Sequence, residues 1–163
     1  MKDWHESQRG YFAGSLFDHM AKDDRIVVIT GDLGFGMFDK IRDMYPNRFF
    51  NVGAAEQSMV GIAVGMALEG KIPFVYTIGS FYLRAAETIS LYLAHEQVPV
   101  KLVGGGRDDD YKHDGYSHYA YEAQKYLEGL GIICSYPELK EDVPGAVNWA
   151  LKNESPMFLS LRR

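Results

Sequence analysis

Four short segments of the chain carry residue types that can bind a ligand or move a proton. Each directly follows a run of apolar residues of the kind that forms a buried strand. The segments are residues 31–36, 51–61, 77–84 and 104–118. Their positions matter because the ligands of parallel α/β sheets bind beyond the carboxyl ends of the strands.

The glycine-rich segment Gly31–Gly36 has the sequence GDLGFG and resembles a nucleotide-binding loop in composition. Dinucleotide-binding loops have the spacing G-x-G-x-x-G, which gives a tight turn and then lets the pyrophosphate approach a helix start. The order G-x-x-G-x-G does not supply that arrangement. We therefore expect a flexible turn here, with dinucleotide binding as the alternative.

The segment 51–61 places an acid at the start of an expected helix. A strand ends at Val52, Gly53 permits a turn, and Glu56 then falls in the first helical turn, where the helix dipole favours a carboxylate. One interpretation is a simple N-terminal acid. Because the surrounding residues are small and apolar, the other interpretation is that Glu56 points into a tight, poorly hydrated place.

Phe81 and Arg84 lie together after the expected strand that ends at Thr77. A phenyl ring offers a plane on which a flat heterocycle can stack, and a guanidinium offers planar donors beside it. The alternative is a core phenylalanine next to a solvated charge.

The polar segment Asp108–His118 contains two histidines and four aspartates. It lacks the spacing of a recognised metal site. It is either a solvated loop or a place where carboxylates and imidazoles contact the hydroxyl or phosphate groups of a substrate.

Apolar runs alternate with longer segments of helical type along the whole chain. The expected strands cover residues 25–30, 48–52, 72–77, 98–103, 132–136 and 157–161. The expected helices cover residues 7–21, 37–45, 55–69, 81–95, 119–130 and 139–152. This alternation predicts βαβ units, and hence a three-layer α/β sandwich with a six-stranded, mainly parallel sheet. We expect residues 1–163 to form a single domain.

Composition and charge indicate which partners and which location to expect. The net charge is −5 and no cluster of Lys and Arg runs along the chain, so a nucleic-acid partner is not expected. No run of about 18 apolar residues is present, so no membrane-spanning helix is expected. Cys134 is the only cysteine and is interpreted as a core residue. The N-terminus lacks the apolar stretch of a secretory signal, so a cytoplasmic location is predicted.

Three motifs resemble the pyrimidine-binding domain of transketolase-type enzymes, which use thiamine diphosphate. Asn51-x-Gly53-x-Ala55-Glu56-Gln57-x-Met59-x-Gly61 is similar to the family pattern N-x-G-I-A-E-Q-N-M-x-G. Phe81-x-x-Arg84 is similar to a motif of 1-deoxyxylulose-5-phosphate synthase and of many split transketolases. Asp114-Gly115-x-Ser117-His118 is similar to D-G-P-[ST]-H. The resemblance covers roughly residues 10–161.

The resemblance implies a role for seven residues. Glu56 would hydrogen-bond the aminopyrimidine ring of the cofactor and drive the tautomer whose imino group takes the thiazolium proton. The ring would stack on one aromatic side chain and lie beside two further residues, with an acid close by: Phe81, Ile78, Arg84 and Asp32. Two polar residues would face the substrate: Asp114 and the catalytic candidate His118.

The departures from the family pattern bear on the substrate. The family's isoleucine, asparagine and proline are replaced by Ala54, Ser58 and Tyr116, and Gly106 falls where transketolases commonly carry a histidine. These differences leave open which sugar is the donor.

The chain also lacks the G-D-G…N motif with which the family holds diphosphate and Mg²⁺. The resemblance therefore implies a partner: a diphosphate-binding transketolase-like subunit that carries the Mg²⁺, in a heterotetramer. Small residues spaced four apart, such as Gly61 and Gly65, would suit close packing against another subunit or against the sheet.

Three functions are consistent with this pattern. The first is a split transketolase-like enzyme that transfers a two-carbon ketol unit between sugars or sugar phosphates. The second is a split 2-oxo acid decarboxylase, whose motifs do not usually include D-G-x-S-H. The third is a catalytically silent orphan domain. The presence of Glu56, Phe81 and His118 together favours an enzyme.

Overall fold

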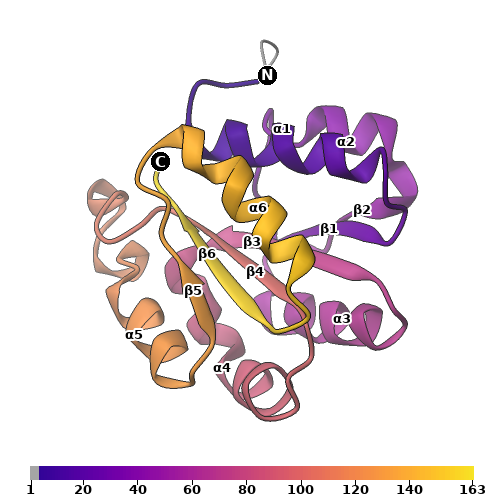
Figure 1. Cartoon of the computed structure of the whole chain (residues 1–163). Helices are drawn as coiled ribbons and strands as arrows, with labels where there is room; N and C mark the ends of the chain where they lie inside the picture. Colours follow the sequence, from indigo (N-terminus) through magenta and orange to yellow (C-terminus); the bar gives the residue numbers. More distant parts are fainter. Residues whose placement is uncertain (1–3) are drawn as a thin grey trace.

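The protein is an α/β sandwich built on one six-stranded sheet (Figure 1). The computed structural model describes residues 4–163. The strands, in chain order, are β1 (Ile26–Thr30), β2 (Phe49–Asn51), β3 (Ile72–Ile78), β4 (Lys101–Gly105), β5 (Ile133–Ser135) and β6 (Met157–Leu161). They lie in the order β2-β1-β3-β4-β6-β5, and every neighbouring pair is parallel. The predicted fold class is therefore confirmed.

Helices cover both faces of the sheet (Figure 1). One face carries α1 (Gln8–Met20), α2 (Asp39–Met44) and α6 (Val143–Lys152). The other carries α3 (Glu56–Leu68), the 3-10 helix η2 (Gly79–Ala85), α4 (Ala86–Thr88), the π-helix η3 (Ile89–His95) and α5 (Tyr121–Gly129). Four more 3-10 turns complete the chain: η1 (Pro46–Arg48), η4 (Lys112–Asp114), η5 (Tyr116–His118) and η6 (Lys140–Asp142).

The strands contribute side chains to two hydrophobic cores, because successive side chains of a strand point to opposite faces of the sheet. In β1, Val28 packs into the core under α1 and α6, whereas Ile29 packs into the core under α3. All five residues of β1, and likewise of β4 and β6, are buried. Strands buried on both faces are what near-continuous apolar runs predict.

The order of the strands creates a crevice at the carboxyl edge of the sheet. After β1 the chain turns to α2 on one face, whereas after β3 it turns to η2 on the other face. Neighbouring strands whose connections leave toward opposite faces form a topological switch point, which is where open α/β sheets bind ligands. The segments that follow β1, β2, β3 and β4 are the four that the sequence singled out.

The expected helix 81–95 differs most from what is observed. This segment is a 3-10 helix, one α-turn and a π-helix in succession. The tight start brings the backbone close to the segment that follows β4, since a Cβ on Gly79 would lie 3.2 Å from both Gly106 O and the Cβ of Ala120. It also places the Tyr82 hydroxyl inside the sheet, 2.6 Å from Val75 O.

The fourth strand is also shifted, from the expected 98–103 to Lys101–Gly105. It continues through Gly104 and Gly105 because both pair with the end of β3. Their lack of side chains makes room for aromatic rings: a Cβ on Gly104 would lie 2.9 Å from the Phe158 ring. The other expected elements match to within three residues, except that the helix expected from residue 139 starts as η6. Within residues 4–163, no helix is long and apolar enough to cross a membrane.

Candidate functional site

The carboxyl group of Glu56 lies at the first residue of α3, in a nearly closed environment. The helix has no side-chain cap at Ala55, and Glu56 is only 3% exposed. Its Oε1 accepts a hydrogen bond from Nη1 of Arg84 at 2.7 Å. A buried carboxylate needs such a partner, because burial of an unpaired charge is costly. Glu56 is therefore a buried acid at the carboxyl edge of the sheet, as one of the two sequence-based interpretations holds.

Phe81 and Arg84 form the other side of this site. The guanidinium carbon of Arg84 lies 3.9 Å from the centroid of the Phe81 ring, so the guanidinium stacks on that ring. Arg84 comes from η2, where the 3-10 turn brings positions 81 and 84 onto one side. Its side chain is 53% exposed, so the ion pair with Glu56 is open to solvent at one end.

His118 contacts the ring of Phe81. The two rings meet edge to face, with centroids 5.1 Å apart. The His118 Nδ1 lies 3.0 Å from the hydroxyl of Ser117. Ser80 of η2 donates a hydrogen bond to Ser117 O at 2.9 Å, which fastens the loop to the segment that carries Phe81.

The structure thus links Glu56, Phe81, Arg84 and His118 through a chain of direct contacts, and the other three candidates make different contacts. Asp114 is exposed, and its carboxylate lies 3.1 Å from His113 Nε2. Asp32 is exposed and has a positive φ of 59°.

The backbone of Asp32 is tied to the end of β2. Its N–H donates to Oδ1 of Asn51 at 2.9 Å, and the same oxygen accepts from Gly53 N at 3.1 Å. The motif residue Asn51 therefore holds the turn after β1 beside the turn that leads to Glu56. Ile78, at the end of β3, lines the cavity described next.

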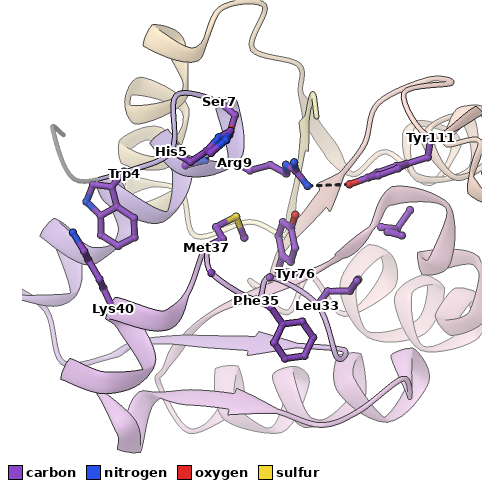
Figure 2. Close-up of a pocket in the computed structure, with 14 residues that line it drawn as sticks. Trp4, His5, Ser7, Arg9, Leu33, Phe35, Met37, Lys40, Tyr76 and Tyr111 are labelled. Atoms are coloured by element: carbon purple, nitrogen blue, oxygen red, sulfur yellow. Dashed lines mark hydrogen bonds between the residues drawn. The ribbon is translucent and has the colours of Figure 1, made fainter. Parts of the chain in front are cut away.

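A cavity of about 420 Å³ lies beside this cluster on the α1 side of the sheet (Figure 2). Its walls come from the residues before and at the start of α1, the loop after β1, the end of β3 and the loop after β4. The labelled wall residues are Trp4, His5, Ser7, Arg9, Leu33, Phe35, Met37, Lys40, Tyr76 and Tyr111.

Arg9 is the polar centre of the cavity. Figure 2 shows its guanidinium reaching toward Tyr111, to whose hydroxyl Nη1 donates at 3.0 Å. Tyr76 also contacts Arg9, and burial raises the pKa of the Tyr76 phenol to about 12, so this group stays neutral. Among residues 4–163, no carboxylate forms an ion pair with Arg9. Within the described range, the guanidinium charge therefore has no carboxylate counter-ion in the cavity.

Tyr111 separates the cavity from His118, with ring centroids 6.3 Å apart. Its ring lies directly over Gly106, where a Cβ would come within 2.2 Å of it. Gly106 also has a φ of +82°, a conformation that favours glycine. A side chain at position 106 would therefore clash with the ring of Tyr111.

Two aspartates of the polar loop serve to hold the loop in place. Asp108 and Asp110 each form an ion pair with Arg162 at 3.2 Å. The Asp110 carboxylate also accepts from the backbone N–H groups of Arg107 and Arg163, both at 3.0 Å. Asp108 and Asp110 therefore bind other groups of the chain and hold the loop against its C-terminal residues.

The sequence did not single out Arg9, Tyr76 or Tyr111. Arg9 precedes the first strand and is not in a segment that follows one. Tyr76 is inside a strand and reads as a core residue. Tyr111 lies in a candidate segment, but an aromatic residue in a polar loop gave no signal without the shape of the cavity.

The Glu56 and Phe81 side chains are of the types that could hold the flat ring of thiamine diphosphate. They already hold a planar, nitrogen-bearing group between them, since the Arg84 guanidinium stacks on Phe81 and donates to Glu56. An aminopyrimidine is likewise planar and also carries nitrogen at its edge. In the described part of the chain, no group of three or more His, Cys, Asp or Glu side chains is gathered that could hold a metal ion.

Comparison with known families identifies the chain. The model of the transketolase pyrimidine-binding domain matches residues 8–163. The chain therefore belongs to the transketolase pyrimidine-binding domain family.

Curated relatives include a 6-deoxy-6-sulfo-D-fructose transketolase subunit of Clostridium sp. (strain MSTE9). It is 28% identical over 158 residues, which are 95% of this chain and 49% of the relative. A 1-deoxy-D-xylulose-5-phosphate synthase of Treponema pallidum is 31% identical over 91% of this chain and 24% of the relative. The chain thus spans at most about half the length of these relatives.

Solved structures agree with the fold. A structure described as a split gene transketolase, inactive beta4 tetramer, has a TM-score of 0.84 and 28% identity, and covers 96% of this chain and 51% of that chain. Transketolase from Leishmania mexicana has a TM-score of 0.85 at 21% identity, covering 96% of this chain and 25% of the other. The latter shows the shared fold alone.

Proposed function

We propose that this chain is the pyrimidine-binding subunit of a split transketolase-like enzyme that transfers a two-carbon ketol unit between sugars or sugar phosphates. It works with a second subunit that holds the diphosphate and Mg²⁺ of thiamine diphosphate, and the two form a heterotetramer. The observation that carries this proposal is the buried carboxyl of Glu56, which binds the guanidinium that stacks on Phe81 at the carboxyl edge of the sheet.

Bound thiamine diphosphate supplies the carbon nucleophile of such a reaction. Glu56 holds one edge of the aminopyrimidine with its carboxyl group, and Phe81 supports the face of the ring. Because Glu56 is excluded from water, its hydrogen bond to the ring does not compete with solvent. His118, whose ring lies against Phe81, faces the substrate and can move a proton at a substrate oxygen.

The 420 Å³ cavity is suited to the end of the substrate that is remote from the reacting carbon. Tyr111 lies between the cavity and His118, so a substrate at His118 that passes beside the Tyr111 ring would extend into the cavity. Arg9 has no counter-ion among residues 4–163 and can recognise an anionic group there. A phosphorylated or otherwise anionic sugar fits these walls better than a neutral one.

A decarboxylating reaction is the second candidate. The 31% identity to 1-deoxy-D-xylulose-5-phosphate synthase and the shared Phe81-x-x-Arg84 motif favour it over an inactive domain. The two candidates differ in the donor, which is a ketose in the first and a 2-oxo acid in the second.

Reconstitution tests the proposal. The chain is mixed with a diphosphate-binding subunit that carries a G-D-G…N motif, and the complex is given thiamine diphosphate, Mg²⁺ and either ketose phosphates or pyruvate. We expect ketol transfer by the complex only. Release of CO₂ from pyruvate would establish the second candidate. Micromolar binding of thiamine diphosphate by the chain alone, measured by calorimetry, would contradict the split site.

A further inference from the structure

The guanidinium of Arg84 makes two contacts at once that a flat heterocycle in this site would also make. It stacks on Phe81 at 3.9 Å and donates to Glu56 at 2.7 Å. A guanidinium is planar and delocalised, stacks on aromatic faces and donates hydrogen bonds in its own plane. An aminopyrimidine shares the planar shape and the nitrogen-bearing edge. Both groups therefore compete for the same space.

Because Glu56 is buried, the ring and the guanidinium cannot both contact its carboxylate at the same time. The residue is 3% exposed, so almost none of its carboxylate surface is free beside Arg84. A ligand can reach the carboxylate only after a covering group moves. Arg84 is the covering group most able to move, because its side chain is long and 53% exposed.

We propose that Arg84 is a placeholder for the cofactor ring: in the isolated chain it occupies the ring's position between Glu56 and Phe81, and it leaves both when the ring binds. This inference rests on the proposed function, since it takes the aminopyrimidine to be the ligand of Glu56. It assigns Arg84 a role different from that of a residue that simply lies beside the bound ring. Its contact with Glu56 keeps the buried carboxylate paired until the ring replaces it.

The contacts that Arg84 gives up are weak enough to be exchanged. An ion pair open to solvent at one end is screened by water, and a cation stacked on a half-buried ring gains little more. Removing Arg84 therefore opens the site and should strengthen ring binding, whereas removing a true ring-binding group would weaken it. A placeholder and a ring-binding residue at position 84 therefore predict opposite changes in the affinity for the ring when Arg84 is removed.

The test uses the neutral ring alone, 4-amino-5-hydroxymethyl-2-methylpyrimidine, because a neutral probe does not respond to the lost charge. It is titrated into the full chain, and binding is followed by NMR at the Phe81 ring and the Glu56 carboxyl carbon. We expect Arg84→Met to bind the probe about three- to tenfold more tightly than the wild type, as loss of a screened ion pair and one stacking contact implies. Arg25→Met is the matched control, since Arg25 forms an exposed ion pair with Asp23 at the same 2.7 Å distance.

A second measurement does not depend on any variant. In the wild-type chain, the Arg84 Nε signal should move toward that of a free arginine as the probe saturates. Equal or weaker binding by Arg84→Met, or an Arg84 signal that stays unchanged while Glu56 and Phe81 respond, overturns the placeholder role. No response of Glu56 and Phe81 to the probe in either protein overturns the placeholder role, whereas the proposed function is tested separately by ketol transfer in the reconstituted complex.

Discussion

The buried Lys101 allows a quantitative test of how burial changes the pKa of a side chain and, through it, the stability of the fold. Its side chain enters the protein at the start of β4 and is only 3% exposed. Its Nζ donates to Asn153 O and Ser155 O, both at 2.6 Å, and so holds the turn between α6 and β6. Burial lowers the pKa of Lys101 to about 8 from 10.5, while the nearby Glu154 acts in the opposite direction.

The sign of the pH effect follows from this lowered pKa. Between pH 8 and pH 10.5 the unfolded chain binds a proton at Lys101 that the folded chain has already lost. The free energy of unfolding therefore rises with pH across this window. At 1.36 kcal/mol for each pKa unit, the gain is about 3 kcal/mol when complete and about 2 kcal/mol by pH 9.5.

Urea unfolding at pH 7.0 and pH 9.5 measures the effect. The comparison is between the wild type and Lys101→Met, which keeps an unbranched apolar side chain and removes the titrating amine. We expect the difference in unfolding free energy between the two proteins to grow by about 2 kcal/mol in favour of the wild type from pH 7.0 to pH 9.5. A difference that stays constant, or that shrinks, would show that the folded protein keeps Lys101 charged and would refute the reasoning.

Three further outcomes are expected. Tyr82→Phe should lower the free energy of unfolding by about 1–3 kcal/mol in a urea titration, because Val103 N and Val75 O lose the buried hydroxyl that binds them; an unchanged midpoint would show that these groups find other partners. His118→Ala in the reconstituted complex should lower kcat while leaving the affinity for thiamine diphosphate nearly unchanged, and the reverse pattern would assign His118 to the cofactor. Arg9→Met should raise the KM for a phosphorylated donor about tenfold or more but change the KM of its unphosphorylated counterpart little; equal effects on both would remove the anion site.

Much of the fold could be predicted because the pattern of this sequence is local. The buried strands β1, β4 and β6 lie in near-continuous apolar runs, and such runs at regular spacing predict a parallel sheet between two helical layers. The position of Glu56 could also be predicted, since Gly53 and the small residues around it mark the turn between a strand and a helix.

The remainder depends on contacts between distant segments. The 3-10 start of the segment at Gly79 reflects its approach to Ala120 and Gly106, which periodicity does not report. The end of β4 at Gly105 depends on the aromatic rings of Tyr76 and Phe158, which fill the space beside the glycines. These residues are far apart in the sequence.

The same reason limits prediction of the site. Arg9 and Tyr111 are separated by 102 positions and meet only because the loop after β4 folds back over α1. Asp108 and Asp110 resemble ligand-binding carboxylates in the sequence, but Arg162 at the far end of the chain pairs with both. A single sequence cannot distinguish such a structural carboxylate from a functional one.

The account depends most on the contact between Glu56 and the cofactor ring. The direct measurement is the rate at which the C2 proton of bound thiamine diphosphate exchanges with deuterium in the reconstituted complex, for the wild type and for Glu56→Gln. A carboxyl that drives proton transfer through the ring predicts a rate at least about 10²-fold slower in Glu56→Gln. Equal exchange rates in the two proteins, with the cofactor bound in both, would contradict it.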